Sequence, residues 1–137
     1  MSDEKSQIRK KFLLKRKKLF SHKIMFPFND IYKLIKKKFK NKKILLAGYY
    51  PINFEVGVIN FLSYLSSKGI KTALPIITKN YGMKFKAWNT DESMYLNKYG
   101  IPEPSVANKT LIPNVILVPL LAYDKKLNRL GYGGGYY

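Results

Sequence analysis

The glycine-rich end of the chain is the part of this sequence best suited to chemistry. Gly131, Gly133, Gly134 and Gly135 fall within five residues. Glycines let successive backbone N–H groups turn towards one centre without a Cβ in the way, and such a nest binds phosphate oxygens. Arg129, just upstream, can add a positive charge. The cluster predicts an anion site, although a flexible C-terminal tail could have the same composition.

Two common phosphate-binding motifs do not fit this cluster. A P-loop needs Lys followed by Ser or Thr after the glycines, but here Tyr136 and Tyr137 follow. The dinucleotide fingerprint G-x-G-x-x-G would need a glycine at position 136. The glycines alone therefore leave the kind of phosphate loop open.

Two further cations are spaced so that they can act together. Residues 3–20 alternate apolar and basic side chains at helical spacing, with Asp3 and Glu4 in the first turn, which predicts an amphipathic helix. Lys5 and Arg9 are four residues apart and therefore project from one face of this helix. A second helix is predicted from Pro27 to about residue 40, because apolar residues recur there at helical spacing.

The elements that must position these groups follow in alternation. We expect buried strands at residues 44–50, 70–77 and 114–123, an edge or hairpin strand at 82–88, a helix at 54–68 capped by Asn53 and closed by Gly69, and a short helix at 91–98. This order predicts a three-layer α/β fold with N-terminal helices and a mostly parallel central sheet. In such sheets ligands bind beyond the carboxyl ends of the strands.

Composition narrows the class of protein. The chain has 137 residues, no cysteine, and 26 basic against 8 acidic residues, for a net charge of +18. No disulfide framework or thiolate metal site is possible, and no segment is long and apolar enough to span a bilayer. We expect a cytoplasmic protein that does not bind membranes. The excess of lysine fits either an anionic partner or a compositional bias with solvated helix faces, and it leaves a nucleic-acid-binding protein as an alternative.

The residues from Val115 to Tyr137 resemble a known family signature. VILVPLLAYDKKLNRLGYGGGYY is similar to the signature of the 5-formyltetrahydrofolate cyclo-ligases, also called methenyltetrahydrofolate synthetases. The matching positions are Pro119, Ala122, Tyr123, Asp124, Arg129, Leu130, Gly131, Gly133, Gly135, Tyr136 and Tyr137. The segments KSQIRKK, YYPINFEV, TALPII, MKFKAW and GIPEP resemble further family segments in the same order, so that the resemblance covers essentially the whole chain.

The resemblance implies a one-carbon-metabolism ligase that uses ATP and Mg²⁺ to convert 5-formyltetrahydrofolate, with or without a polyglutamate tail, into 5,10-methenyltetrahydrofolate. We expect a monomer without a specific nucleic-acid partner. The resemblance assigns Glu55 to the folate and Asp124 to the shape of the loop. Tyr50 and Trp88 are candidates for stacking on the folate rings, and each could equally be an ordinary core residue. To ATP the resemblance assigns Lys5, Arg9, Arg129, Leu130, Gly131, Tyr132, Gly133, Gly134, Gly135, Tyr136 and Tyr137. No catalytic residue is assigned.

One departure from the family pattern concerns the metal. The family carries a Mg²⁺-binding Asp directly after the Tyr-Tyr pair and then several dozen further residues that form a strand and a helix. We therefore expect residues 1–137 to form a single domain that is incomplete at its C-terminus, without the last strand and helix and without a metal ligand. A catalytically inactive homologue that only binds nucleotide or folate is the second alternative.

Overall fold

A computed structural model describes residues 2–20 and 26–137. His22, which the sequence predicts to be exposed on a helix, lies outside the described residues. The elements are α1 (Ser2–Phe20), α2 (Phe28–Phe39), β1 (Leu45–Ala47), α3 (Ile59–Ser67), β2 (Lys71–Ile77), the 3₁₀ turn η1 (Lys79–Tyr81), β3 (Met83–Ala87), β4 (Met94–Leu96), β5 (Pro102–Pro104), β6 (Thr110–Leu111), β7 (Val115–Ile116), β8 (Ala122–Tyr123) and β9 (Arg129–Leu130).

The main sheet has five strands in the order β6-β3-β2-β1-β7. β1 pairs in parallel with β2 and with β7, whereas β3 is antiparallel to both β2 and β6. β6 therefore runs in the same direction as β2, and β3 alone of these five strands is reversed. The predicted α/β class with a mostly parallel central sheet is confirmed. Asn114 fixes β7 beside β1, because its side chain accepts a hydrogen bond from the Leu45 N–H and donates one to the Lys43 carbonyl.

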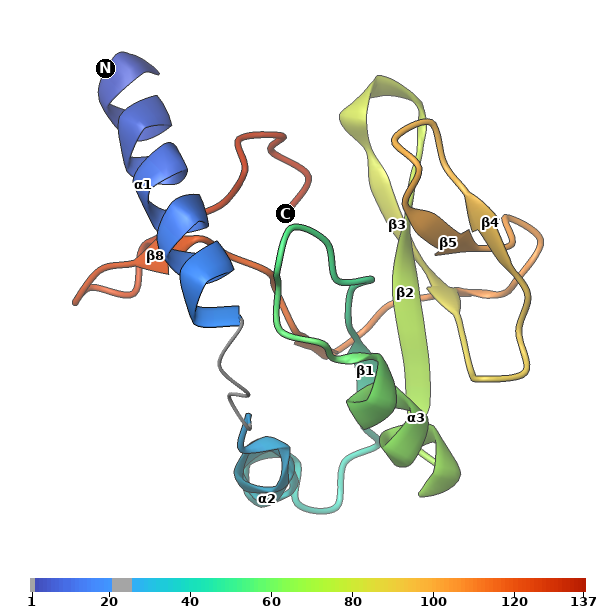
Figure 1. The fold of residues 1–137 in the computed structure, drawn as a ribbon. Helices are drawn as coiled ribbons and strands as arrows, with labels where there is room; N and C mark the ends of the chain where they lie inside the picture. The colour runs from blue at the N-terminus through green and yellow to red at the C-terminus, as the bar shows by residue number, and fades with distance from the viewer. Residues whose placement is uncertain (1, 21–25) are drawn as a thin grey trace.

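Alternation along the strands separates the two faces of this sheet. Leu46 and Leu74 point to the larger core, which α2 and α3 cover with Ile35, Phe61, Leu62 and Leu65. Their neighbours Ala47 and Ala73 belong to a smaller cluster together with Leu111. Figure 1 shows α2 and α3 at one end of the sheet, and α1 apart from them beside the C-terminal segment, which is drawn in red.

Gly48 is required where β1 leaves the sheet. A Cβ at this position would lie 2.7 Å from the Leu62 Cδ1, which is far too close for a carbon–carbon contact. The missing side chain lets α3 approach the end of β1. This approach places the loop after β1, residues 49–58, over the edge of the sheet where the candidate site lies.

Two predicted helices differ from the structure. The helix predicted at 54–68 begins only at Ile59, because Asn53 and Phe54 adopt positive φ values of 47° and 62° and form a tight turn instead. It ends as predicted at Gly69, whose φ is +79°. The helix predicted at 91–98 is wrong, because its centre forms β4, which pairs antiparallel with β5.

The strand predicted at 114–123 is divided in two. Only β7 joins the main sheet, and after a loop β8 pairs with β9 to form a separate hairpin. Asp124 shapes the turn of this hairpin, since its carboxylate accepts hydrogen bonds from the Lys126 and Asn128 N–H groups and from the Asn128 side chain. These bonds, that of the Asn128 side chain foremost, lower the pKa of Asp124. The predicted loop-shaping role of Asp124 is therefore confirmed.

No helix within residues 2–20 and 26–137 is both long enough and apolar enough to cross a membrane.

Candidate active site

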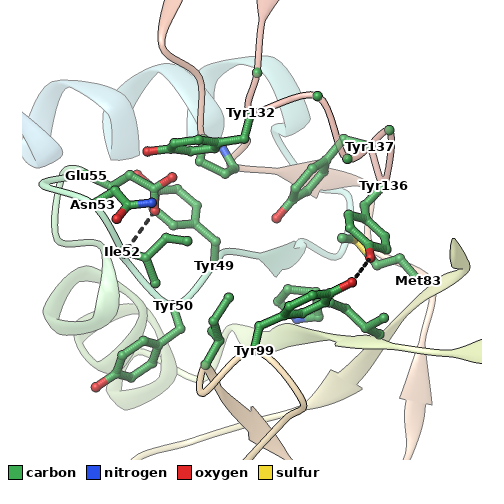
Figure 2. Close-up of a pocket in the computed structure, with 18 of the residues that line it drawn as sticks. Tyr49, Tyr50, Ile52, Asn53, Glu55, Met83, Tyr99, Tyr132, Tyr136 and Tyr137 are labelled. Carbon is green, nitrogen blue, oxygen red and sulfur yellow. Dashed lines mark hydrogen bonds between the residues drawn. The ribbon is translucent and has the colours of Figure 1, made fainter. Parts of the chain in front are cut away.

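A cavity of about 1010 Å³ opens at one edge of the sheet. Its walls include Tyr49 and Tyr50 from the loop after β1, Ile77 at the end of β2, and Pro119 from the segment after β7. The cavity thus lies beyond the carboxyl ends of the three adjacent parallel strands, where ligands bind in open α/β sheets. Figure 2 shows Glu55 and Tyr49 on one side of the cavity, with Tyr136 and Tyr137 on the other.

The structure brings almost all of the predicted site residues together around this cavity. Those that line it are Lys5, Arg9, Tyr50, Glu55, Arg129, Leu130, Gly131, Tyr132, Gly133, Gly134, Gly135, Tyr136 and Tyr137. They come from α1, from the loop after β1 and from the C-terminal segment, which are far apart in the sequence. We call residues 131–137 the glycine loop.

The first helix contributes the cations at one wall. Lys5 is exposed and Arg9 is half-buried, one turn further along α1. The Arg9 Nε donates a 3.0 Å hydrogen bond to the Gly131 carbonyl oxygen. A Cβ on Gly133 would lie 3.3 Å from the Arg9 Cζ, so that the guanidinium lies directly against the loop backbone. The Nε bond leaves the terminal nitrogens of Arg9 able to bind an anion in the cavity.

The glycine loop adopts backbone conformations that need glycine. Gly133 and Gly135 have φ values of +99° and +68°. At φ +99° any side chain would strain the backbone, and here it would also displace the Arg9 guanidinium. The Arg129 guanidinium lies over the Tyr137 ring, 5.7 Å from its centroid. The loop thus combines freely turning amides with two arginines, which suits phosphate binding.

Glu55 lies in a tight loop before α3. The helix predicted at 54–68 would have placed it in the first turn of a helix. Its Oε2 accepts a 2.8 Å hydrogen bond from the Ile52 N–H, while its own N–H donates to the Ile52 carbonyl. The residue is 7% exposed. Burial raises the pKa of the Glu55 carboxyl, although the Ile52 N–H and Arg16 oppose the shift. The Tyr132 hydroxyl also interacts with this carboxylate and opposes the shift, and the Glu55 side chain lines the cavity.

Among the described residues, sequence reasoning missed three of the seven tyrosines that line the cavity, namely Tyr49, Tyr81 and Tyr99. Tyr49 lies beside Glu55, and its hydroxyl donates to the Val56 carbonyl. Burial, and then the Glu55 charge, raise the pKa of Tyr49 to about 12. Tyr137 is 42% exposed, but its hydroxyl points into the cavity (Figure 2), and burial raises its pKa. The doublet that Tyr49 forms with the predicted Tyr50 was the available clue to Tyr49.

Tyr99, also missed, connects the β4–β5 hairpin to the glycine loop. Its hydroxyl lies 3.2 Å from the Tyr136 hydroxyl. This hydrogen bond is the largest cause of opposite pKa shifts, lowering the pKa of Tyr99 and raising that of Tyr136 to about 12. Asn97 and Glu103 fix the hairpin, because the Glu103 carboxylate accepts hydrogen bonds from the Asn97 side chain and the Ile77 N–H. No local sequence pattern predicts the pairing of Tyr99 with Tyr136, which lie 37 residues apart.

Trp88 is not among the residues that line this cavity. It is 7% exposed and packs in the larger core, and Thr72 contacts its backbone through two hydrogen bonds. Its indole Nε1 is buried without a hydrogen-bond partner within the described residues. The structure therefore places Trp88 with the core, whereas Tyr50, the other predicted aromatic, lines the cavity and is 38% exposed.

A second cavity of about 1010 Å³ lies behind the first. Tyr49, Glu55 and Pro119 line both cavities and form the wall between them. The second cavity is lined mainly by apolar side chains from α1, α2 and residues 117–123, together with Arg16. Sequence reasoning also missed Arg16, which lines the second cavity but not the first.

The first cavity offers a nest of amides, several cations, tyrosine rings and a buried carboxylate. This set suits a ligand that combines phosphates with a flat, hydrogen-bonding ring. A model of the 5-formyltetrahydrofolate cyclo-ligase family matches residues 1–137. The chain belongs to this family.

Curated cyclo-ligase relatives agree with the assignment. The 5-formyltetrahydrofolate cyclo-ligase of Mycoplasma genitalium is 31% identical, over 98% of this chain and 74% of that protein. The enzyme of the same name from Haemophilus influenzae is 32% identical over 67% of this chain. That match spans about half of the Haemophilus protein, 52% of its length.

Solved cyclo-ligase structures share the fold. The 5,10-methenyltetrahydrofolate synthetase of Aquifex aeolicus superposes with a TM-score of 0.76 at 28% identity, over 97% of this chain and 69% of that one. The synthetase of Mycoplasma pneumoniae superposes with a TM-score of 0.61 at 22% identity, over 97% of this chain and 74% of that one. This likeness supports the fold alone.

Proposed function

We propose that this cyclo-ligase family member converts 5-formyltetrahydrofolate into 5,10-methenyltetrahydrofolate with consumption of ATP. One observation carries the proposal. Three groups of residues that are distant in the sequence, the α1 cations, the loop with Glu55 and the glycine loop, line a single cavity. The names of the curated relatives support the same activity.

The nucleotide would bind along α1 and the glycine loop. The loop amides and the terminal nitrogens of Arg9 would receive phosphate oxygens, and Lys5 would add a second charge from the same helix face. Arg129 adds a third cation at the cavity wall. Together these groups offset the charge of a triphosphate and orient it towards the centre of the cavity.

The folate would bind opposite, against the loop that follows β1. The Glu55 carboxylate would accept hydrogen bonds from ring N–H donors of the pterin, in addition to its contacts with the Ile52 N–H and Tyr132. Tyr50 can pack against a flat ring from the cavity wall. A cavity of about 1010 Å³ is at the upper end of the usual range for ligand pockets, about 300–1,000 Å³, as a site for two substrates requires.

The reaction balances without a further reactant. The formyl oxygen bonds to the γ-phosphorus of ATP, and the bond from that phosphorus to the bridging oxygen breaks, releasing ADP. Nitrogen 10 then adds to the formyl carbon and loses its proton, while the carbon–oxygen bond breaks and inorganic phosphate leaves. The role of the protein is positioning and charge stabilisation at the transferred phosphoryl group.

Magnesium is not given a step in this proposal. The described residues include no group of three or more His, Cys, Asp or Glu side chains that could hold a metal ion. The two carboxylates at the cavity, Glu55 and Glu103, each accept a backbone hydrogen bond. This donor set does not fit a protein-built Mg²⁺ site, and Mg²⁺ use stays a prediction from the sequence.

The deciding experiment is a turnover assay on the purified chain. 5-Formyltetrahydrofolate and MgATP are added, and formation of the methenyl product is followed by its near-ultraviolet absorbance. We expect ATP-dependent product from the wild type and from Glu92→Gln, a carboxylate outside both cavities, but not from Glu55→Gln. A folded chain that binds ATP without forming product would contradict the proposal and favour a nucleotide- or folate-binding homologue without turnover.

The other expectations remain predictions. A nucleic-acid-binding role would show as affinity for DNA or RNA that survives moderate salt, since charge alone gives binding that salt abolishes. The cytoplasmic location, the monomeric state and the use of polyglutamylated folate are likewise untested.

A further inference from the structure

Arg16 connects the segments that carry the two proposed substrates. It lies on α1, seven residues or two turns after Arg9, and therefore on nearly the same helix face. Its Nη1 donates a 2.6 Å hydrogen bond to the Tyr132 hydroxyl in the glycine loop. Its Nη2 donates to the Leu120 carbonyl, in the segment after β7. The two terminal nitrogens thus hold two different chain segments at once.

The same guanidinium also reaches the loop that carries Glu55. Its Nη1 is 3.5 Å from the Asn53 carbonyl oxygen, at the limit of a hydrogen bond. Its positive charge lowers the pKa of both Glu55 and Tyr132, against the larger effect of burial. The Arg16 Cζ lies 5.9 Å from the centroid of the Tyr132 ring. Arg16 therefore stands where the glycine loop and the loop before α3 meet.

Arg16 lines the second cavity and not the first. It reaches the first cavity only through Tyr132, Glu55 and their neighbours, so it is placed to orient residues that contact ligand and not to contact ligand itself. A planar guanidinium with several fixed donors suits such a junction, and a lysine with one flexible ammonium cannot make both bonds in the same geometry.

We infer that Arg16 is a positioning residue that holds the glycine loop and the Glu55 loop in one arrangement, and thereby couples nucleotide binding to folate binding. The coupling half of this inference rests on the proposed function. When nucleotide fixes the glycine loop, Tyr132 and Arg16 carry the constraint to Asn53 and Glu55. Bound nucleotide thereby tightens folate binding by some factor, and by linkage bound folate must tighten nucleotide binding by the same factor.

The first test measures coupling without turnover. Affinity for a non-hydrolysable ATP analogue is measured by calorimetry with and without saturating 5-formyltetrahydrofolate. We expect folate to tighten the wild-type affinity by about fivefold or more, the lower end of common allosteric couplings. In Arg16→Met the factor should fall to near one, and Arg16→Lys should recover little of it. Lys11→Met removes an exposed cation from the same helix and should keep the wild-type factor.

The second test needs no ligand. Hydrogen–deuterium exchange of the free chain should be faster in Arg16→Met than in wild type or Lys11→Met, both in residues 50–56 and in residues 129–137. The hydrogen bonds of Arg16 within the described residues go to Asn53, Tyr132 and Leu120 and none to α3. Exchange in α3 should therefore be unchanged and serves as the check on folding.

The outcomes separate this inference from the proposed function. A wild type that binds both ligands without coupling, or an Arg16→Met variant that keeps the coupling, would overturn the inference even where product forms. If Arg16→Lys kept the full wild-type coupling factor, a positive charge alone would be sufficient, and the two bonds of the guanidinium would not be needed. A wild type without turnover or folate affinity would refute the proposed function. If, in addition, Arg16→Met left exchange in residues 50–56 and 129–137 unchanged, the positioning role would be refuted as well.

Discussion

The Arg9 Nε donates a 3.0 Å hydrogen bond to the Gly131 carbonyl oxygen, and this contact joins the first helix to a loop 122 residues further along the chain. The guanidinium also lies against Gly133. Arg9 therefore builds the wall of the cavity and at the same time presents its free terminal nitrogens to it. In the proposed function, the shape of the nucleotide site and its charge depend on the same side chain.

Replacing Arg9 should weaken nucleotide binding more than the loss of one charge would. Arg9→Met removes a charge-assisted hydrogen bond, worth about 1.5–3 kcal/mol, together with a phosphate contact. We expect the dissociation constant of ATP to rise at least about tenfold, which corresponds to about 1.4 kcal/mol. Titration calorimetry measures the change. Lys10→Met removes the neighbouring exposed cation, and an equal loss in that variant would contradict a specific role for Arg9.

Gly133→Ala should disturb the same wall from the opposite side. The backbone has φ +99°, and the new methyl group would meet the Arg9 guanidinium at 3.3 Å. Left-handed backbone costs an L-residue about 1–2 kcal/mol, so the loop should shift and nucleotide affinity should fall. Gly57→Ala is the matched control, because nothing lies within 4 Å of a Cβ there and its φ is not positive. Affinity and denaturant unfolding that match wild type in Gly133→Ala would show that the loop tolerates a side chain.

The buried carboxylate of Glu55 should make stability depend on pH. Burial raises its pKa above the ordinary 4.5, so the folded chain binds a proton more readily than the unfolded chain. The free energy of unfolding should therefore decrease as the pH rises from about 4.5 through the raised pKa, and the cost is fully present above that point.

Urea unfolding of wild type and Glu55→Gln across this pH range checks the sign. The variant should gain stability relative to wild type as the pH rises, while it loses folate affinity. Glu92→Gln reports the effect of removing a carboxylate elsewhere. A difference between Glu55→Gln and wild type that is constant with pH, or that shrinks as the pH rises, would contradict the shift.

The first strands and the cations of the site could be predicted from the sequence, because both depend on local patterns. Continuous apolar runs identified β1 and β2, and the glycine cluster with Arg129 and the spacing of Lys5 and Arg9 predicted cations that do share one cavity. The family resemblance supplied Glu55. Its local structure was predicted wrongly, because positive φ values at Asn53 and Phe54 replace the expected first turn of a helix.

What the sequence did not predict depends on partners that are distant along the chain or in space. Residues 91–98 carry helix-capping side chains, but pairing with β5 makes their centre a strand. Arg16 is one of 16 basic residues in the first 43, and nothing local distinguishes it from its neighbours. Its contacts with Leu120 and Tyr132 exist only once the C-terminal segment lies along α1.

Trp88 gives the clearest contrast between the resemblance and the structure. The resemblance offered it as a ring that stacks on the folate, but the structure buries it in the core, and it does not line the cavity. Trp88→Phe should therefore lower stability, because a smaller ring leaves a gap in the core, and should leave folate affinity unchanged. Tyr50→Ala should do the reverse, weakening folate binding by about 0.5–1.5 kcal/mol through the lost ring contact.

The single tryptophan also supplies a direct readout. A buried indole is poorly accessible to acrylamide, so fluorescence quenching in the folded chain should be weak and should become strong only on unfolding. Calorimetric folate titrations of both variants complete the test. The opposite outcome would be a Trp88→Phe variant with wild-type stability but weaker folate binding, and a wild-type indole that acrylamide quenches readily. That outcome would show that Trp88 belongs to the site and not to the core.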